Sequence, residues 1–79
     1  MITDTPTIPL HNIYEAAYLD FKGISVQMLK EGRRIIFLLP DTPGTYQIIA
    51  EFNRNPTLKI QDYLTHLRKL RAMMISLRD

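Results

Sequence analysis

The sequence predicts one small α+β domain with the order helix, strand, strand, helix, helix (αββαα), in which helices cover an antiparallel hairpin. Apolar residues recur at helical spacing in residues 13–22 and 60–79. Between them, residues 24–39 show two apolar stretches separated by a glycine turn, which is typical of a hairpin. The 79 residues are too few for a second domain. We expect residues 1–10 to form an N-terminal arm and residues 11–79 to form the domain.

The first helix is expected over residues 13–22. Asn12 is a favoured N-cap residue, and Glu15 follows three residues later, as in a capping box. Gly23 then supplies the left-handed conformation with which helices commonly end. The apolar stripe that would face the core consists of Tyr14, Ala17, Tyr18 and Phe21.

The hairpin is expected over residues 24–39. Residues 24–29 form its first strand, and the turn covers residues 30–33, where Gly32 supplies a positive φ. The second strand, residues 34–39, is apolar at its last five positions, which predicts burial on both faces. A hairpin alone cannot cover both faces of one strand, so we expect further strands or two covering layers.

The second helix is expected to begin at Pro43, with Thr42 as its N-cap. Its apolar side includes Ile48, Ile49 and Phe52, and the segment that ends at Pro56 stops it. Residues 57–60 are then either a short edge strand or the lead into the last helix.

The last helix, residues 60–79, has apolar residues at alternating spacings of three and four, the pattern of a helix with one long apolar face. That face is broader than a lone small core needs, so we expect it to contact a second protein chain. Oligomerisation also suits a short chain without cysteine, because neither a large core nor a disulfide stabilises it. The predicted interface residues are Tyr63, Leu67, Leu70, Met73, Met74 and Leu77.

Positive charge is concentrated toward the C-terminal end of the sequence. The net charge of +2 is the sum of −2 over residues 1–53 and +4 over residues 54–79. If the hairpin turn approaches the last helix, basic side chains from both would form one patch for phosphates or another acidic partner. Alternatively, these charges only keep a small apolar protein soluble. The residues of this expected patch are Arg33, Arg34, Arg68, Lys69 and Arg71.

No residue pattern indicates catalysis, a cofactor or a metal centre. Ser25 and Ser76 lie outside a nucleophile elbow, and the glycines are too isolated for a phosphate-binding loop. Asp62 and His66 share one face of the last helix, but a metal site needs three or four ligands. The absence of cysteine and of a long apolar run leads us to expect a cytoplasmic protein without a membrane span. We therefore expect no enzymatic activity.

Four short segments resemble a family of small uncharacterised bacterial and phage proteins. They are Tyr14 to Gly23 (YEAAYLDFKG), Gly32-Arg33-Arg34, Asp41-Thr42-Pro43 and Tyr63 to Leu70 (YLTHLRKL). Together they extend over roughly residues 12–77, which is most of the chain. The resemblance implies a fold of this kind and a phage or mobile-element context, and it implies no activity for any residue.

Three functions are compatible with these observations. The first is a non-enzymatic interaction module that self-associates, or joins a complex, through the apolar face of the last helix. The second is a nucleic-acid-binding regulator that uses the basic face of that helix and the hairpin turn. The last two helices loosely fit a helix-turn-helix, although the connection over residues 53–59 is longer than usual. The third is a small phage-type inhibitor that binds a host protein.

Overall fold

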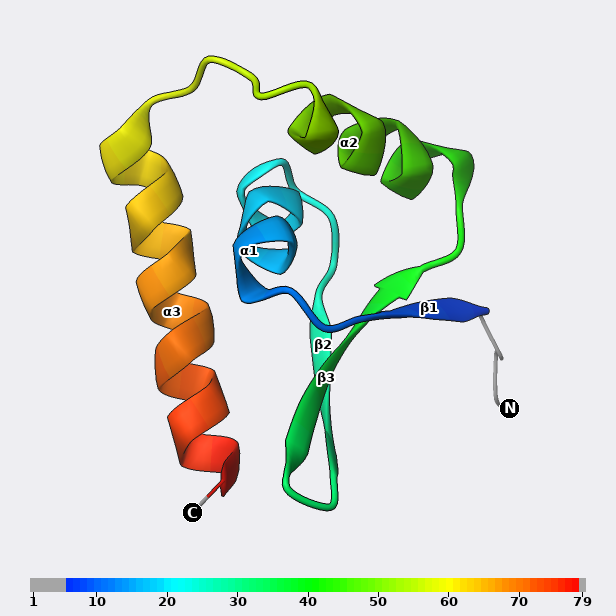
Figure 1. Cartoon of the computed structure of the whole chain (residues 1–79), viewed down its shortest axis with the longest axis vertical. Helices are drawn as coiled ribbons and strands as arrows, with labels where there is room; N and C mark the ends of the chain where they lie inside the picture. Colours follow the sequence, from blue (N-terminus) through cyan, green and yellow to red (C-terminus); the bar gives the residue numbers. More distant parts are fainter. Residues whose placement is uncertain (1–5, 79) are drawn as a thin grey trace.

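The computed structural model of the chain describes residues 6–78. The part of the expected arm in residues 1–5 and the end of the domain at Asp79 lie outside the described residues. Within residues 6–78, three antiparallel strands and three helices form a small α+β domain, which confirms the predicted class (Figure 1). The elements are β1 (Thr7–Leu10), α1 (Ile13–Phe21), β2 (Gln27–Glu31), β3 (Arg34–Pro40), α2 (Pro43–Asn53) and α3 (Ile60–Arg78).

The sheet has the order β1-β3-β2, so β3 is its central strand. Residues 7–10, which the sequence placed in the arm, form β1 and pair antiparallel with the second half of β3, from Leu10 opposite Phe37 to Thr7 opposite Pro40. This third strand supplies a neighbour that the apolar sequence of β3 required. The run is buried as predicted, with Leu38 half-buried and the others buried: Ile35, Ile36, Phe37 and Leu39.

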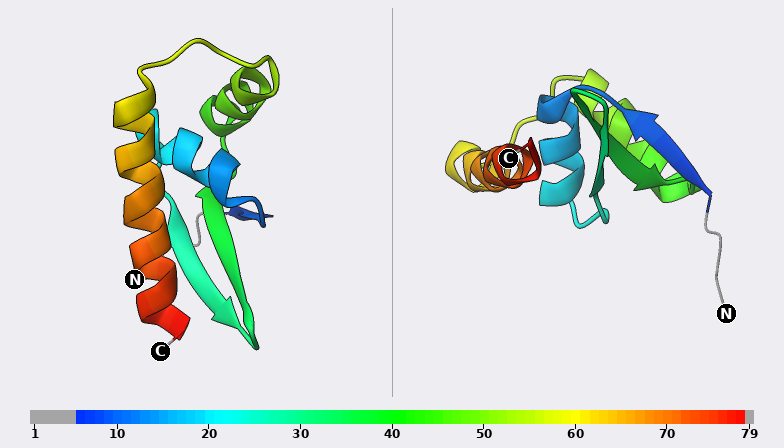
Figure 2. Two further views of the ribbon diagram at one scale, coloured as in Figure 1. Left: turned by 60° about the vertical axis from the view of Figure 1, so that its left-hand side comes forward. Right: turned by 90° about the horizontal axis from the view of Figure 1, so that it is seen from below.

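The core lies where α1 packs between α3 and the sheet (Figure 2). Phe37 of β3 belongs to one buried cluster with Ala16 and Ala17 of α1 and with Leu67 and Leu70 of α3. The short alanine side chains let both the sheet and α3 approach α1 closely. The apolar side of α3 is therefore part of the core of the domain itself.

α1 has a third neighbour, because α2 packs against it as well. The rings of Tyr18 and Phe52 lie 5.5 Å apart between their centroids, and the Tyr18 hydroxyl donates a hydrogen bond to Glu51. With neighbours on several sides, α1 buries four consecutive residues, 16–19, rather than one stripe. Tyr14, at the start of the predicted stripe, is instead 49% exposed.

Both predicted N-caps are present. Asn12 Oδ1 accepts hydrogen bonds from the N–H groups of Tyr14 and Glu15, at 2.9 and 3.4 Å. Thr42 Oγ1 accepts one from the N–H of Thr45 at 3.3 Å. The helix starts were predicted correctly because a cap depends on residues that are neighbours in the sequence.

The hairpin is shifted relative to the prediction. β2 begins at Gln27 and continues to Glu31, so the loop consists of Gly32 and Arg33 alone. Gly32 has a φ of +65°, as expected. A positive φ at only the first residue of a two-residue loop is the pattern of a type II′ turn, whose twist matches that of the strands.

α3 is the longest helix, with 19 residues. The connection before it, residues 54–59, has no regular structure, so residues 57–60 do not form an edge strand. It is also longer than the short turn of a helix-turn-helix. Neither α3 nor any other helix within residues 6–78 combines the length and apolar character needed to cross a membrane.

Candidate interaction surfaces

The interface predicted on α3 is partly buried within the domain. Leu67 and Leu70 belong to the core, and Tyr63 and Met74 are half-buried and pack against it. This corrects the expectation for Leu67 and Leu70, which are not on a surface that a second chain can reach. The physical reason is that these residues pack against α1, whose buried side chains they shield from water.

The exposed remainder of the predicted interface lies beside β2. Met73 and Leu77 are 45% and 38% exposed, and with Met28 and Ser76 they line an open groove of about 370 Å³ between β2 and α3. Leu29, the next residue of β2, lies on the opposite face of the sheet and is 44% exposed. We call Met28, Leu29, Met73 and Leu77 the apolar edge.

The main chain of β2 is open along this apolar edge, because among residues 6–78 β2 pairs only with β3. Hydrogen bonds alternate along an antiparallel pair, starting at the residues that flank a two-residue loop, here Glu31 and Arg34. Met28 and Lys30 therefore direct their N–H and C=O groups to the open side. The Lys30 side chain turns away, and its Nζ donates a hydrogen bond to the main-chain oxygen of Arg78 at 3.3 Å.

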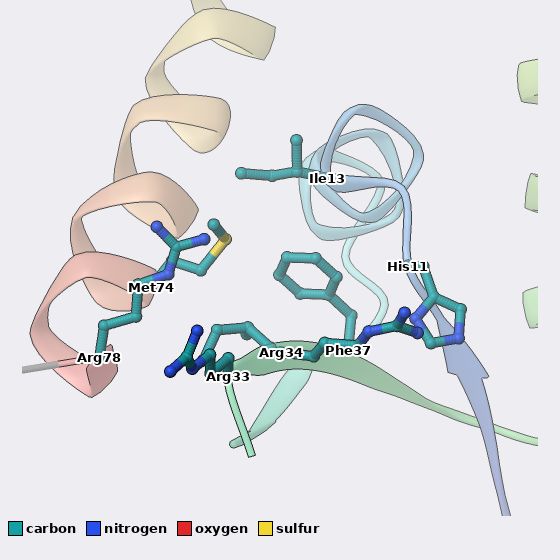
Figure 3. A pocket seen from close by; sticks show the side chains of 8 residues that line it. His11, Ile13, Arg33, Arg34, Phe37, Met74 and Arg78 are labelled. Atoms are coloured by element: carbon teal, nitrogen blue, oxygen red, sulfur yellow. The ribbon is translucent and has the colours of Figure 1, made fainter. Parts of the chain in front are cut away.

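A second surface lies where the hairpin turn approaches the C-terminal end of α3 (Figure 3). Arg33 and Arg34 of the hairpin, Arg78 of α3 and His11, which precedes α1, border an open hollow of about 380 Å³. We call this the basic hollow. Its apolar lining consists of Ile13, Ile35, Phe37 and Met74.

Arg71 lies on the flank of α3 that leads to the basic hollow. It precedes Arg78 by seven residues, two helical turns, so both side chains project on the same flank. The Arg71 Nη2 donates a hydrogen bond to the Tyr14 hydroxyl at 3.2 Å, and its guanidinium carbon lies 5.8 Å from the centre of the Tyr14 ring. Arg68 is exposed to solvent on the outer side of α3.

Lys69 is separated from this basic surface. Its Nζ lies 2.7 Å from Oδ2 of Asp20, which His66 Nδ1 also contacts at 2.5 Å. Burial raises the pKa of the Asp20 carboxyl, but the hydrogen bonds from Lys69 and His66 outweigh it and hold that pKa below its ordinary value. The expected patch is therefore divided, with Lys69 neutralised beside α1.

The patch expected from the sequence does not include three residues of the basic surface: His11, Tyr14 and Arg78. The spacing of seven from Arg71 to Arg78 was a usable signal, because it places both on one side of a helix. No local signal places His11, because it lies in the connection between β1 and α1, and the pairing of β1 with β3 sets where that connection runs.

The titratable clusters connect helices rather than surround a hollow. Tyr18 of α1 and Lys22, which follows α1 directly, both contact Glu51 of α2, and these hydrogen bonds lower the pKa of the Glu51 carboxyl. His66 is engaged by the carboxylate of α1, not by Asp62 on its own helix. In the part of the chain that the structure describes, no three His, Cys, Asp or Glu residues are grouped to hold a metal ion.

The fold and these surfaces define a small α+β domain with one apolar edge and one basic hollow. Residues 5–76 match the protein family described as Domain of unknown function (DUF5659), and the chain belongs to that family. The resemblance to an uncharacterised family is thereby confirmed, without a statement about bacterial or phage origin. Comparison with curated proteins and with solved structures gave no match.

Proposed function

We propose that this domain is a non-enzymatic interaction module that self-associates, with the apolar edge of one copy packed on that of a second copy. The observation that carries the proposal is the gathering of exposed apolar side chains around a strand with one open edge. Met73 and Leu77 lie on one face beside β2, and Leu29 lies on the other face. Exposed apolar groups arranged together in this way are typical of protein interfaces.

A two-fold arrangement of two copies about β2 would satisfy main-chain groups that one copy leaves open. Antiparallel pairing of two copies of β2 would double the three-stranded sheet to six strands, and the outward N–H and C=O groups of Met28 and Lys30 would find partners. The same patch would meet itself, as a two-fold interface requires. The apolar grooves beside β2 would then be adjacent, and Met73 would leave water.

The charge that commonly protects an edge strand does not oppose this pairing. Lysine side chains often project from an edge strand and prevent its association. Here Lys30 reaches the carboxyl end of α3, where the helix dipole is negative. A chain of 79 residues without cysteine also gains more from an additional buried surface than a larger domain does.

Sedimentation equilibrium of the full chain at about 1–100 μM tests the proposal. We expect the native protein to have twice the monomer mass of 9.2 kDa at the upper end of this range. The double substitution Met73→Glu and Leu77→Glu should give a monomer, because it places four carboxylates in an apolar two-fold contact.

Ile75→Glu is the matched control. Ile75 is 58% exposed, on the side of α3 away from the groove beside β2, so its substitution should leave the mass unchanged. A native protein that remains at 9.2 kDa over the whole range would contradict the proposal. Equal dissociation by the control would do the same, since it would move the contact away from β2.

The other functions have different support. The basic hollow favours an anionic ligand. No feature of residues 6–78 specifically favours an inhibitor of a host protein. The cytoplasmic location and the bacterial or phage origin stay predictions from the sequence.

A further inference from the structure

We infer that the basic hollow, together with Arg71 and Tyr14 on the adjoining flank of α3, binds a single-stranded nucleic acid. In this arrangement the arginines contact phosphates, and the exposed Tyr14 ring stacks on a base. The surface lies on the other flank of α3 from Met73 and Leu77, so it is separate from the apolar edge. The inference therefore goes beyond self-association and does not depend on it.

Like charges from distant parts of the chain converge on the basic hollow. Arg33 lies in the hairpin loop, Arg34 begins β3 and Arg78 ends α3, yet all three border one hollow (Figure 3). Like charges gathered in this way repel one another and destabilise the folded chain unless an anion joins them. Arginine is also the residue best suited to phosphate, because its planar donors bind two oxygens at once.

Within residues 6–78, acidic side chains do not neutralise these arginines. The salt bridges of this part of the chain involve Lys22, His66 and Lys69, and none involves a residue of the basic hollow or Arg71. Glu31 lies opposite Arg34 in the hairpin register, without a salt bridge to it. Among the described residues, the arginines of the hollow therefore keep their positive charge for a ligand.

The basic groups are spaced too widely for one small anion. Arg71 and Arg78 are two turns apart, about 10 Å along α3, and the hairpin arginines border the same hollow as Arg78. One phosphate ion cannot contact all of these groups at once. A strand that carries a phosphate at every nucleotide can, and this favours a polyanion over a small anion.

The exposed Tyr14 ring favours a single strand over a duplex and over an acidic protein. Half of the surface of Tyr14 is exposed, and the Arg71 side chain fixes its ring at the edge of the basic surface. Aromatic rings beside a basic groove bind unpaired bases by stacking. A duplex offers no free base, and an acidic peptide needs no ring. The long connection before α3 also does not resemble a helix-turn-helix that would enter a major groove.

Fluorescence polarisation with labelled oligo-dT of about 20 nucleotides, long enough for a continuous site, tests the inference. The full chain should bind at low salt, and binding should weaken as salt increases. The double substitution Arg33→Ala and Arg78→Ala should weaken it at least tenfold. The log–log salt slope should also fall by about 1.4, about 0.7 for each of the two lost phosphate contacts on a single strand.

Two further variants make the test specific. Arg54→Ala with Lys59→Ala removes the same charge from the connection before α3, and this control should change the affinity less than threefold. Tyr14→Ala should weaken binding by about five- to a hundredfold, the range for loss of one stacked base, and leave the salt slope unchanged. A stacking contact loses no counterion, so this combination distinguishes a base contact from a phosphate contact.

Three results would overturn the inference. The first is no binding at tens of micromolar protein in low salt. The second is an equal loss of affinity in the Arg54 and Lys59 control, which would mean attraction by net charge alone. The third is tighter binding of a duplex of the same length, or of a poly-glutamate peptide, which would assign the surface to another class of partner.

Discussion

The Asp20 side chain joins α1 to α3 through its carboxylate. Its carboxylate accepts hydrogen bonds from His66 and Lys69, which lie one turn apart on α3. The folded-state pKa of Asp20 is lowered, so the ionised form is preferred in the folded protein. By linkage, the stabilisation is complete above the unfolded-state pKa, about 3.9, and is lost as the pH falls through the folded-state value.

Asp20→Asn should therefore lower the free energy of unfolding by about 1–2 kcal/mol at pH 7, because the charged hydrogen bonds are lost. The difference from the native protein should shrink toward zero as the pH falls below the lowered folded-state pKa, where the native carboxyl is protonated too. Urea denaturation at several pH values measures both effects. Asp62→Asn is the control, and this exposed substitution should stay within about 0.5 kcal/mol at every pH. A pH-independent difference for Asp20→Asn would contradict the account.

Phe37 occupies the centre of the core, between the sheet and the helices. It is fully buried and contacts α1 and α3 through one cluster. Phe37→Ala should lower the free energy of unfolding by about 3–5 kcal/mol, a large part of the stability of a domain this small. Ile75→Ala, at an exposed site, should change it by less than about 1 kcal/mol. Thermal denaturation of the two variants compares them, and similar midpoints would be inconsistent with this core.

Two glycines give opposite predictions at the scale of secondary-structure elements. Gly32 has a φ of +65° in the hairpin loop, so Gly32→Ala should destabilise the domain by about 1 kcal/mol. Gly44 lies in the first turn of α2 without a positive φ, and an added Cβ would meet only Thr42 Oγ1 at 3.9 Å. Gly44→Ala should stabilise the domain by about 0.5–1 kcal/mol. Chemical denaturation gives both signs, and equal signs would contradict the positive φ of Gly32.

Elements set by local chemistry could be predicted from the sequence, and β1 could not. The caps at Asn12 and Thr42 and the turn at Gly32 depend on adjacent residues, and all three were predicted. Pro6 and Pro9 made residues 1–10 resemble an arm, but Pro9 pairs with Leu38 at a position without ladder hydrogen bonds. The Asp41 N–H donates to the Pro6 carbonyl at 2.9 Å, in keeping with that alternation. Only the distant β3 makes this segment a strand.

The surfaces of the whole molecule were predicted in part. The sequence showed that α3 has both an apolar and a basic side, but not which residues the core would use. Leu70 was assigned to a partner and is buried, because α1 became the most enclosed helix. Lys69 was grouped with Arg71, although 200° of helical rotation separates two residues two positions apart. Packing between distant elements, which local patterns do not contain, decided the first case, whereas helix geometry alone separates Lys69 from Arg71.

The central claim is that β2 is the edge at which two copies meet, and amide hydrogen exchange tests it most directly. The Met28 and Lys30 N–H groups point to the open side of β2, whereas Leu29 bonds to β3. Exchange should be compared at about 5 μM and about 500 μM protein, on either side of a micromolar dissociation constant. We predict that Met28 and Lys30 become protected at the higher concentration while Leu29 is protected at both. Exchange of Met28 and Lys30 that is fast and identical at both concentrations would contradict the claim.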